Sequence, residues 1–170
     1  MKKLLSVFFM MLILLFGCAG MQSVSEGPIE KIVSVRGFSK NQIFDRTKIY
    51  IAENFRSTKA VLEYENKETG TIIGNGKIKY PATGFGATAL KDWTVNFTMR
   101  VDIKDGRFRC TFSNLRLLSP ESYDRISGVK PRGEREIKTE AEYDEIKAEL
   151  LKIPDKIKAY VIGSKQTDNW

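Results

Sequence analysis

The chain has 170 residues, of which 28 are Lys or Arg and 21 are Asp or Glu, giving a net charge of +7. This length allows one domain of ordinary size with a hydrophobic core. The sequence contains no histidine, which excludes Ser-His-Asp and Cys-His catalysis and removes the usual zinc ligands. Chemistry based on carboxylate, tyrosine or lysine side chains stays open.

The positive charge is unevenly distributed along the chain. Residues 29–117 contain 16 Lys or Arg against 9 Asp or Glu, whereas residues 139–170 contain 5 against 7. A basic body could meet an anionic partner such as lipid headgroups or sugars, although a solvated surface with a modest charge bias is the simpler interpretation. No segment has the clustered basic residues of a nucleic-acid site, so no nucleic-acid partner is expected.

The N-terminus has the form of a secretory signal peptide. Lys2 and Lys3 precede the apolar run Leu4–Phe16, and the small residue Gly17 stands before Cys18. The apolar run is too short to span a bilayer comfortably, since a spanning helix needs about 20 residues. A short amphipathic or buried helix is the alternative interpretation. We predict that residues 1–17 are a lipoprotein signal peptide and that the polar residues 18–28 form a flexible tether.

The ending Leu15-Phe16-Gly17-Cys18 resembles a bacterial lipobox. This resemblance implies cleavage between Gly17 and Cys18 and the attachment of lipid, including fatty acyl chains such as palmitate, to Cys18. Because Ala19 is not acidic, it also implies an outer-membrane lipoprotein, facing either the periplasm or the cell surface. The membrane, reached through this lipid, is the first expected partner.

A strand and a helix are predicted at the start of the folded region. Ile29–Val35 is rich in Ile and Val, as strands are. Ser39 is a good N-cap, and Gln42 three residues later fits a capping box, so a helix is expected over Lys40–Arg56. Its apolar residues recur at helical spacing and predict one stripe that packs on a sheet.

Two further strands follow the helix. Ala60–Glu65 alternates, which places Leu62 and Tyr64 on one face, and the next strand covers about Thr71–Tyr80. Asn75-Gly76 within it is either a two-residue hairpin turn or a bulge where another group comes close, and we favour the bulge. The glycines here do not have the spacing of a phosphate-binding loop.

The clearest local pattern is a hairpin around Asp105-Gly106. Apolar residues alternate with polar ones through Trp93–Ile103 and again through Phe108–Phe112. A type I′ turn at Asp105-Gly106 places all the apolar residues on one face, so the turn and the alternation agree on the register. The predicted facing pairs are Ile103 with Phe108, Val101 with Cys110, Met99 with Phe112 and, on the opposite face, Asp102 with Arg109.

Cys110 is the second of only two cysteines. If Cys18 carries lipid, no intramolecular disulfide is available, and the domain depends on its hydrophobic core. The place of Cys110 in an alternating strand favours a buried small apolar side chain. A catalytic thiol is disfavoured because no histidine is present to activate it.

The C-terminal part is expected to differ from the preceding domain. Residues 118–138 are rich in turn formers and predict an irregular linker. Thr139 and Glu142 fit a second capping box, and residues 139–170 predict a helical tail that Pro154 kinks or restarts.

Several phrases resemble a family of uncharacterised bacterial exported proteins, many of them lipoproteins, whose domain is described as TATA-binding-protein-like. The phrases are Gly37-Phe38-Ser39-Lys40, the run Gly70–Gly76 and Lys104-Asp105-Gly106-Arg107-Phe108-Arg109. The resemblance covers about residues 33–117. It implies an α+β fold, a curved antiparallel sheet of about five strands with a helix packed on one face, and we assign this domain to residues 29–117. It implies no activity, and likeness to a DNA-binding fold is no evidence for DNA binding.

Three functions remain as hypotheses. The favoured one is a non-catalytic envelope binding or structural module, in which one sheet face or the loop Pro81–Asp92 meets an envelope protein or an anionic glycan or lipid, with no cofactor and no metal. The second is a carboxylate-based envelope hydrolase. The third is the binding of a small apolar ligand or lipid beneath the aromatic side chains. Residues of the partner surface would be Arg100, Arg107 and Arg109; the hydrolase would use Glu63, Asp92, Asp102 or Asp105; the aromatic residues are Trp93, Phe97 and Phe112.

Overall fold

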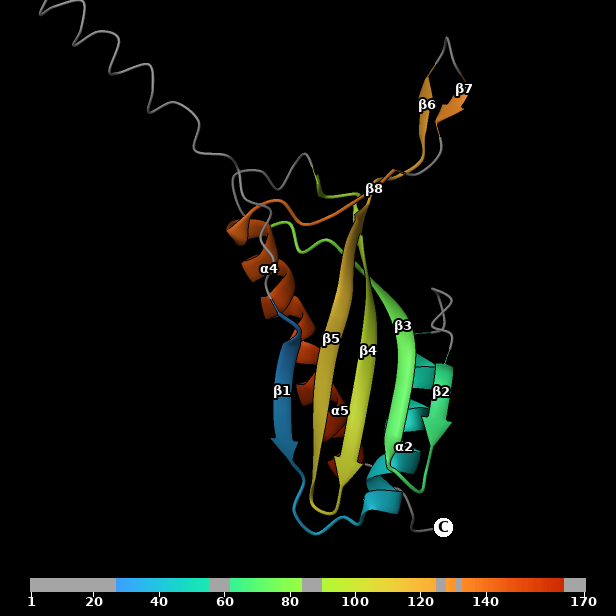
Figure 1. The fold of residues 1–170 in the computed structure, drawn as a ribbon, viewed down its shortest axis with the longest axis vertical. Coiled ribbons are helices and arrows are strands. Elements are labelled where there is room, and N and C mark those ends of the chain that lie inside the picture. Colours follow the sequence, from blue (N-terminus) through green and yellow to red (C-terminus); the bar gives the residue numbers. More distant parts are fainter. Residues whose placement is uncertain (1–26, 56–61, 84–89, 125–127, 131–132, 164–170) are drawn as a thin grey trace, which may run out of the picture.

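The computed structural model describes residues 27–55, 62–83, 90–124, 128–130 and 133–163, so the predicted signal peptide and most of the tether, with Gly17 and Cys18, lie outside the described residues. Eight strands and three helices are described along these ranges (Figure 1). In chain order they are β1 (Ile29–Ser34), α2 (Lys40–Asn54), β2 (Leu62–Asn66), β3 (Thr71–Lys79), β4 (Thr94–Lys104), β5 (Arg107–Leu118), β6 (Ser122–Asp124), β7 (Gly128–Lys130), β8 (Glu134–Arg135), α4 (Glu140–Leu150) and α5 (Lys152–Gly163).

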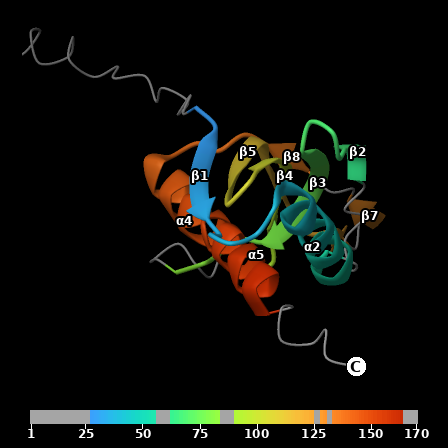
Figure 2. The same ribbon diagram turned by 90° about the horizontal axis from the view of Figure 1, so that it is seen from below.

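The principal sheet is antiparallel, with the strand order β1-β5-β4-β3-β2, and β8 pairs with the end of β5. The helices α2, α4 and α5 lie on one side of this sheet (Figures 1 and 2). The structure therefore has two layers, and it confirms the α+β fold with an antiparallel sheet that the sequence predicted.

The core lies between the two layers. Alternate residues of β4 and β5 point into it, because successive side chains of a strand project from opposite faces. The helices contribute apolar side chains to the same contiguous cluster. Its largest fully buried members are Phe108, Phe112, Ile43, Ile72, Ile103, Leu117, Ile146, Leu150 and Ile157.

The C-terminal helices that the sequence predicted are present as α4 and α5, and both contribute buried side chains to this core. Helix α4 buries Tyr143, Ile146 and Leu150, and α5 buries Ile157 and Val161. These residues recur at helical spacing, so each helix carries an apolar stripe that is stable only against another layer. Pro154 lies in the first turn of α5, where a missing N–H costs little, so α5 restarts the helical chain as expected.

Where we expected an irregular linker over residues 118–138, the described residues of this segment include three short strands. Strand β5 extends to Leu118, and the chain then forms the small β6-β7 hairpin, which projects from the body in Figure 1. It returns as β8, where Arg135 pairs with Leu117. Arg135 also donates to both carboxylate oxygens of Glu142 at 3.1 and 2.7 Å. This bidentate pair secures the returning strand to the first turn of α4.

Helix α2 begins as predicted. The Ser39 hydroxyl accepts from the Gln42 N–H, and the Gln42 side chain accepts from the Ser39 N–H at 3.0 Å, which is a complete capping box. The helix ends at Asn54, and Arg56, its predicted end, lies outside the described residues. At α4 only half of the second box forms. Thr139 accepts from the Glu142 N–H, but the Glu142 carboxylate binds Arg135 and the Lys138 N–H instead.

The β4-β5 hairpin has the predicted register. Ile103 faces Phe108, Val101 faces Cys110, Met99 faces Phe112 and Asp102 faces Arg109. One register accounts for all four pairs, and the alternation of apolar and polar residues predicted it.

The turn of this hairpin differs from the predicted type I′. Of its two central residues only Gly106 has a positive φ, of 70°, whereas type I′ needs a positive φ at both. The turn is held from outside by the segment before α2. The Asp105 carboxylate accepts from the Lys40 N–H at 2.6 Å, the Gly106 N–H donates to the Phe38 carbonyl, and the Gly106 carbonyl accepts from the Val35 N–H.

Strand β3 has neither a hairpin turn nor a bulge at Asn75-Gly76, so the bulge that we favoured at this position is wrong. Strand β3 pairs with β4 in one continuous register from Thr71 to Lys79. The irregularity is in β2, where Leu62 pairs with Gly74 but Tyr64 pairs with Ile73. The extra residue turns Tyr64 to the solvent side, 47% exposed, so Leu62 and Tyr64 do not share a face as predicted.

Gly76 is explained by a close approach of a side chain. A Cβ atom at this position would overlap the ring of Phe97, which is 2% exposed and cannot move aside freely. We therefore expect Gly76→Ala to lower the free energy of unfolding by about 1–3 kcal/mol, as overpacking of a core does.

Urea denaturation of this variant beside Gly27→Ala would measure the effect. Gly27 is a matched control because an added Cβ there meets nothing within 4 Å. Equal stability of the two variants would contradict the contact between Gly76 and Phe97.

Candidate functional site: the open face of the sheet

One face of the principal sheet is not covered by any described helix. The helices lie on the opposite side (Figure 2), and the residues of β4 and β5 that point away from them are polar or charged, apart from Leu118 at the end of β5. We call this surface the open face. Its cationic side chains on β3, β4 and β5 outnumber its carboxylates. The cations are Lys77, Lys79, Arg100, Lys104, Arg107, Arg109 and Arg116, and the carboxylates on the same face of β1 to β5 are Glu30, Glu63 and Asp102.

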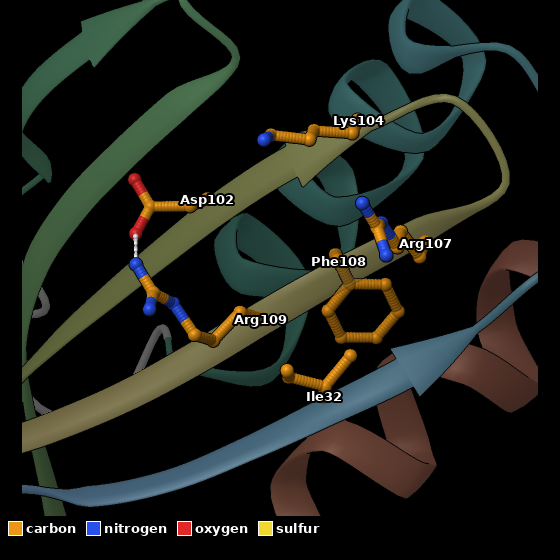
Figure 3. A pocket seen from close by; sticks show the side chains of 6 residues that line it. All are labelled: Ile32, Asp102, Lys104, Arg107, Phe108 and Arg109. Atoms are coloured by element: carbon orange, nitrogen blue, oxygen red, sulfur yellow. Dashed lines mark hydrogen bonds and ion pairs between the residues drawn. The ribbon is translucent and has the colours of Figure 1, made fainter.

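A depression of about 240 Å³ lies at the hairpin end of the open face. Figure 3 shows side chains from β1, β4 and β5 around it. We call it the hairpin depression. Its lining residues are Ile32, Asp102, Lys104, Arg107, Phe108 and Arg109.

Asp102 organises two of the predicted partner residues. Arg109 donates to Asp102 Oδ2 at 3.2 Å, and Arg100 Nη2 lies 2.9 Å from Asp102 Oδ1. The hydrogen bond from Arg100 lowers the pKa of Asp102 below its ordinary value of 3.8, and the bond from Arg109 adds to this shift. Partial burial opposes the shift without reversing it.

The other cations of the depression are available to a ligand. Within the described part of the chain, neither Lys104 nor Arg107 makes an ion pair. Beside them on β1, Ile32 is 69% exposed, the highest value among the large hydrophobic residues that the structure describes as exposed. The depression thus combines unpaired positive charge with one accessible apolar side chain.

The three predicted partner residues therefore share one face but differ in role. Arg100 and Arg109 are held by Asp102, whereas Arg107 has no such carboxylate partner among the described residues. Sequence alternation placed them together. Alternation also places Lys104 on this face, opposite Arg107, but it did not indicate Ile32, since Ile32 lies far away in sequence and joins only through the pairing of β1 with β5.

The carboxylates considered for a hydrolase hold separate contacts. Asp102 binds two arginines, Asp105 caps the Lys40 N–H, and Glu63 accepts from the side-chain amide of Asn75. Asp92 is exposed ahead of β4. Among the described residues, no group of three or more His, Cys, Asp or Glu could hold a metal ion. Absence of catalysis stays a prediction.

Cys110 is buried as expected, with an exposed fraction of 0%. Burial is the main cause that raises the pKa of its thiol, to about 12. A thiol in this state is protonated at neutral pH and is a poor nucleophile.

The aromatic side chains considered for an apolar ligand fill the core. Phe97 and Phe112 are 2% and 0% exposed and pack edge to face, with ring centroids 5.6 Å apart. Trp93 is only partly buried, and the Arg135 guanidinium lies 5.1 Å from its ring centroid. The space beside Phe97 is about 10 Å³, which is close to the minimum for one water molecule, so it offers no room for a ligand.

A second depression on the open face was not foreseen. It measures about 430 Å³ and lies further along β3, β4 and β5, away from the turn. We call it the polar cavity. A bulge in β5 helps to form it, and the only signal in the sequence was an Asn, a residue that tolerates a positive φ, inside a strand. Its polar lining residues are Asn75, Lys77, Asn96, Thr98, Asn114, Arg116 and Glu134.

The loop Pro81–Asp92, the other partner region considered, is described only in part, because residues 84–89 lie outside the described ranges. Across the described residues, no helix is long and apolar enough to cross a membrane.

Residues 30–117 match the family described as "Domain of unknown function (DUF4468) with TBP-like fold", and this chain belongs to that family. The match confirms the predicted resemblance and covers β1 to most of β5.

Two crystal structures are similar to the whole fold. A TBP-like protein from Parabacteroides distasonis ATCC 8503 is 13% identical, with a TM-score of 0.59, over 84% of this chain and 97% of that one. A DUF4468 family protein from Bacteroides ovatus ATCC 8483 is 15% identical, with a TM-score of 0.52, over 85% and 90% of the two chains. At these identities the likeness shows the fold alone. No curated protein matches the chain significantly.

The Asp102 ion pairs make a prediction about acid stability. A depressed pKa means that the pair stabilises the fold above the unfolded pKa and that this contribution is lost as the pH falls through the folded pKa. In a double-mutant cycle with Asp102→Asn and Arg109→Gln, we expect a coupling of less than about 1 kcal/mol at pH 7, because the Arg109 side chain is 46% exposed.

The same cycle, measured by urea denaturation well below the ordinary pKa of 3.8, should show no coupling. A coupling that is unchanged in acid would show that the carboxylate charge is not what joins Asp102 to Arg109.

Proposed function

We propose that this protein is a lipid-anchored cell-envelope protein whose TBP-like domain is a non-catalytic binding module, and that the hairpin depression contacts an anionic glycan. The observation that carries the proposal is the uncovered basic end of the sheet, where Lys104 and Arg107 are without ion pairs among the described residues. The lipobox-like ending at Cys18 supports the anchor.

The position of the chain entry supports a particular orientation. Ile29 pairs with Phe112, while Ser34 pairs with Arg107, so β1 runs from its first residue toward the turn over about 17 Å. In Figure 1 the chain enters β1 at the end away from the β4-β5 turn. A lipid on Cys18 is attached at the end of β1 away from the hairpin depression, and a flexible tether of at most about 39 Å allows the depression to lie away from the membrane surface.

This orientation favours a glycan over the lipid headgroups of the anchoring leaflet. Unpaired Lys and Arg side chains attract carboxylate or phosphate groups and raise the rate of encounter with them. Acidic glycans carry such groups away from the bilayer surface, where this end of the domain would lie. By the lipobox resemblance, the membrane is the outer one, and the domain faces the periplasm or the cell surface.

If lipid is attached to the sulfur of Cys18, replacing this residue should release the protein from the membrane. In the Cys18→Ser variant, lipid cannot be attached, so the protein should lose membrane association and metabolic labelling with palmitate. Fractionation of cells that express either form would measure this shift, with Cys110→Ser as a control that keeps Cys18. A Cys18→Ser protein that sediments with membranes as the natural chain does would refute the anchor.

If the hairpin depression binds an anionic glycan, removing its two unpaired positive charges should weaken that binding. In Lys104→Gln/Arg107→Gln, retention on an immobilised polyuronate should fall by about tenfold, since each exposed charge contributes on the order of 0.5–1 kcal/mol. Added salt should weaken the binding of the unchanged protein. The control is Lys156→Gln/Lys158→Gln, which removes equal charge from exposed positions of α5 on the opposite layer.

Two results would contradict this proposal. Equal losses in both double variants would mean that net charge, not the depression, attracts the polymer. Preferential binding to vesicles of anionic phospholipid, or to an envelope protein, with no retention on polyuronate would assign another partner.

A further inference from the structure

The polar cavity on the open face is built from two rows of side chains that cross three strands. Lys77 pairs with Asn96, and Asn96 pairs with Arg116, so these three residues form one row. Asn75 pairs with Thr98 in the next row. Because the strands hold these residues in register, the cavity has a rigid floor.

A bulge in β5 brings Asn114 to the second row. Thr98 pairs with Ser113 and Asn96 with Arg116, so the single residue between Asn96 and Thr98 lies opposite two residues of β5. Asn114 takes a φ of 54°, the left-handed region that Asn tolerates better than most residues. Bulges often redirect a side chain toward a functional site.

The redirected amide joins a chain of hydrogen bonds. The Asn114 amide donates to the Thr98 hydroxyl at 3.3 Å, and that hydroxyl donates to Asn75 Oδ1 at 2.9 Å. The Asn75 amide in turn donates to the Glu63 carboxylate. These side chains are therefore fixed in direction before any ligand arrives, which lowers the entropy cost of binding.

Asn96 provides an acceptor that the described protein atoms do not satisfy. Its Oδ1 is buried and has no hydrogen-bond partner among the described residues. A buried acceptor without a partner destabilises the fold, because it has lost the hydrogen bond that water would supply. Because this atom is closed to solvent, a ligand hydroxyl would reach it only after neighbouring side chains of the cavity shift, and the hydrogen bond that then forms would offset this destabilisation.

Two cationic side chains line the cavity, and one of them makes no ion pair with the described residues. Arg116 is paired, since its Nη1 lies 2.8 Å from Glu136 and its Nε lies 4.0 Å from Glu134. Lys77 is half-buried and makes no ion pair within the described ranges. The cavity thus presents amides, a hydroxyl, one unpaired ammonium group and the Glu134 carboxylate, whose charge the Arg116 guanidinium offsets, and this combination suits a hydroxyl-rich ligand with one negative charge.

We propose that the polar cavity binds one acidic sugar ring, of the uronic acid class. Lys77 faces the ring carboxylate, Asn96 Oδ1 accepts from a ring hydroxyl, and Asn114 and Thr98 direct the adjacent hydroxyls. The volume of about 430 Å³ falls within the range of small-molecule sites. This inference rests on the proposed function, because it names the sugar unit that a bound glycan would place here.

Titration of the mature chain from residue 18, carrying Cys18→Ser, would test the inference by nuclear magnetic resonance. The probes are glucuronate, glucose and acetate. We expect the largest backbone amide shifts at Asn96, Lys77 and Arg116, and we expect glucuronate to bind more tightly than either glucose or acetate. Equal binding of acetate and glucuronate would reduce the cavity to an anion site and overturn the sugar assignment.

Two variants separate the roles of charge and hydrogen bonding. Lys77→Gln should weaken glucuronate by about tenfold and leave glucose unchanged, as the loss of one charge-assisted contact does. Asn96→Val should weaken both sugars while the midpoint of thermal unfolding stays equal or rises, because the orphan acceptor is removed. The matched control is Lys79→Gln, an exposed lysine on the same strand and face that does not line the cavity.

The outcomes distinguish this site from the hairpin depression. If Lys104→Gln/Arg107→Gln abolishes retention on polyuronate but glucuronate still shifts Asn96, both sites hold. If glucuronate shifts no residue of the cavity, or shifts it equally in the Asn96→Val variant, the inference is wrong even where the depression binds the polymer. A fall in the unfolding midpoint of Asn96→Val would contradict the argument from the orphan acceptor.

Discussion

The two-residue alternation of β4 and β5 is the constraint on which the rest of the structure depends. It places Val101, Ile103, Phe108 and Cys110 on the helix side and leaves the charged residues between them on the other side. A shift of one residue would reverse both faces at once. The core, the position of the helices and the chemistry of the open face are therefore consequences of a single register.

The turn that closes this hairpin is also the point where distant segments meet. Asp105 caps the start of α2, and the backbone of Gly106 bonds to both Phe38 and Val35. The segment Lys104–Arg109, which carries the sequence motif shared with the family, thus connects the central hairpin to the residues between β1 and α2. The same segment supplies Lys104 and Arg107 to the hairpin depression, so it serves both folding and the proposed binding.

Local patterns predicted the elements whose determinants are close in sequence. The hairpin register, the Ser39 cap and the burial of Cys110 each follow from residues within one element or one turn. The type of the Asp105-Gly106 turn was wrong because its hydrogen bonds come from Lys40 and Phe38, far away in sequence. The packing of α4 and α5 against the sheet was missed for the same reason, although their apolar spacing was visible.

The candidate site was only partly predictable. Alternation correctly grouped Arg100, Arg107 and Arg109 on one face, but the pairing of Asp102 with two of them required the neighbouring Arg100 side chain to turn toward it. The polar cavity depends on a bulge at Asn114. The neighbouring sequence does not predict that an Asn within a strand will take a positive φ. Cross-strand bulges are decided by the packing of neighbouring strands, which no single segment encodes.

We propose that one covalent lipid joins this open sheet face to a membrane, and the mass of the native N-terminus is the most direct measurement of that claim. Mass spectrometry of the protein purified from its own membranes should find a chain that begins at Cys18 and is heavier than its encoded residues by the attached lipid. A native chain that begins at Met1 with only its encoded mass would contradict the account.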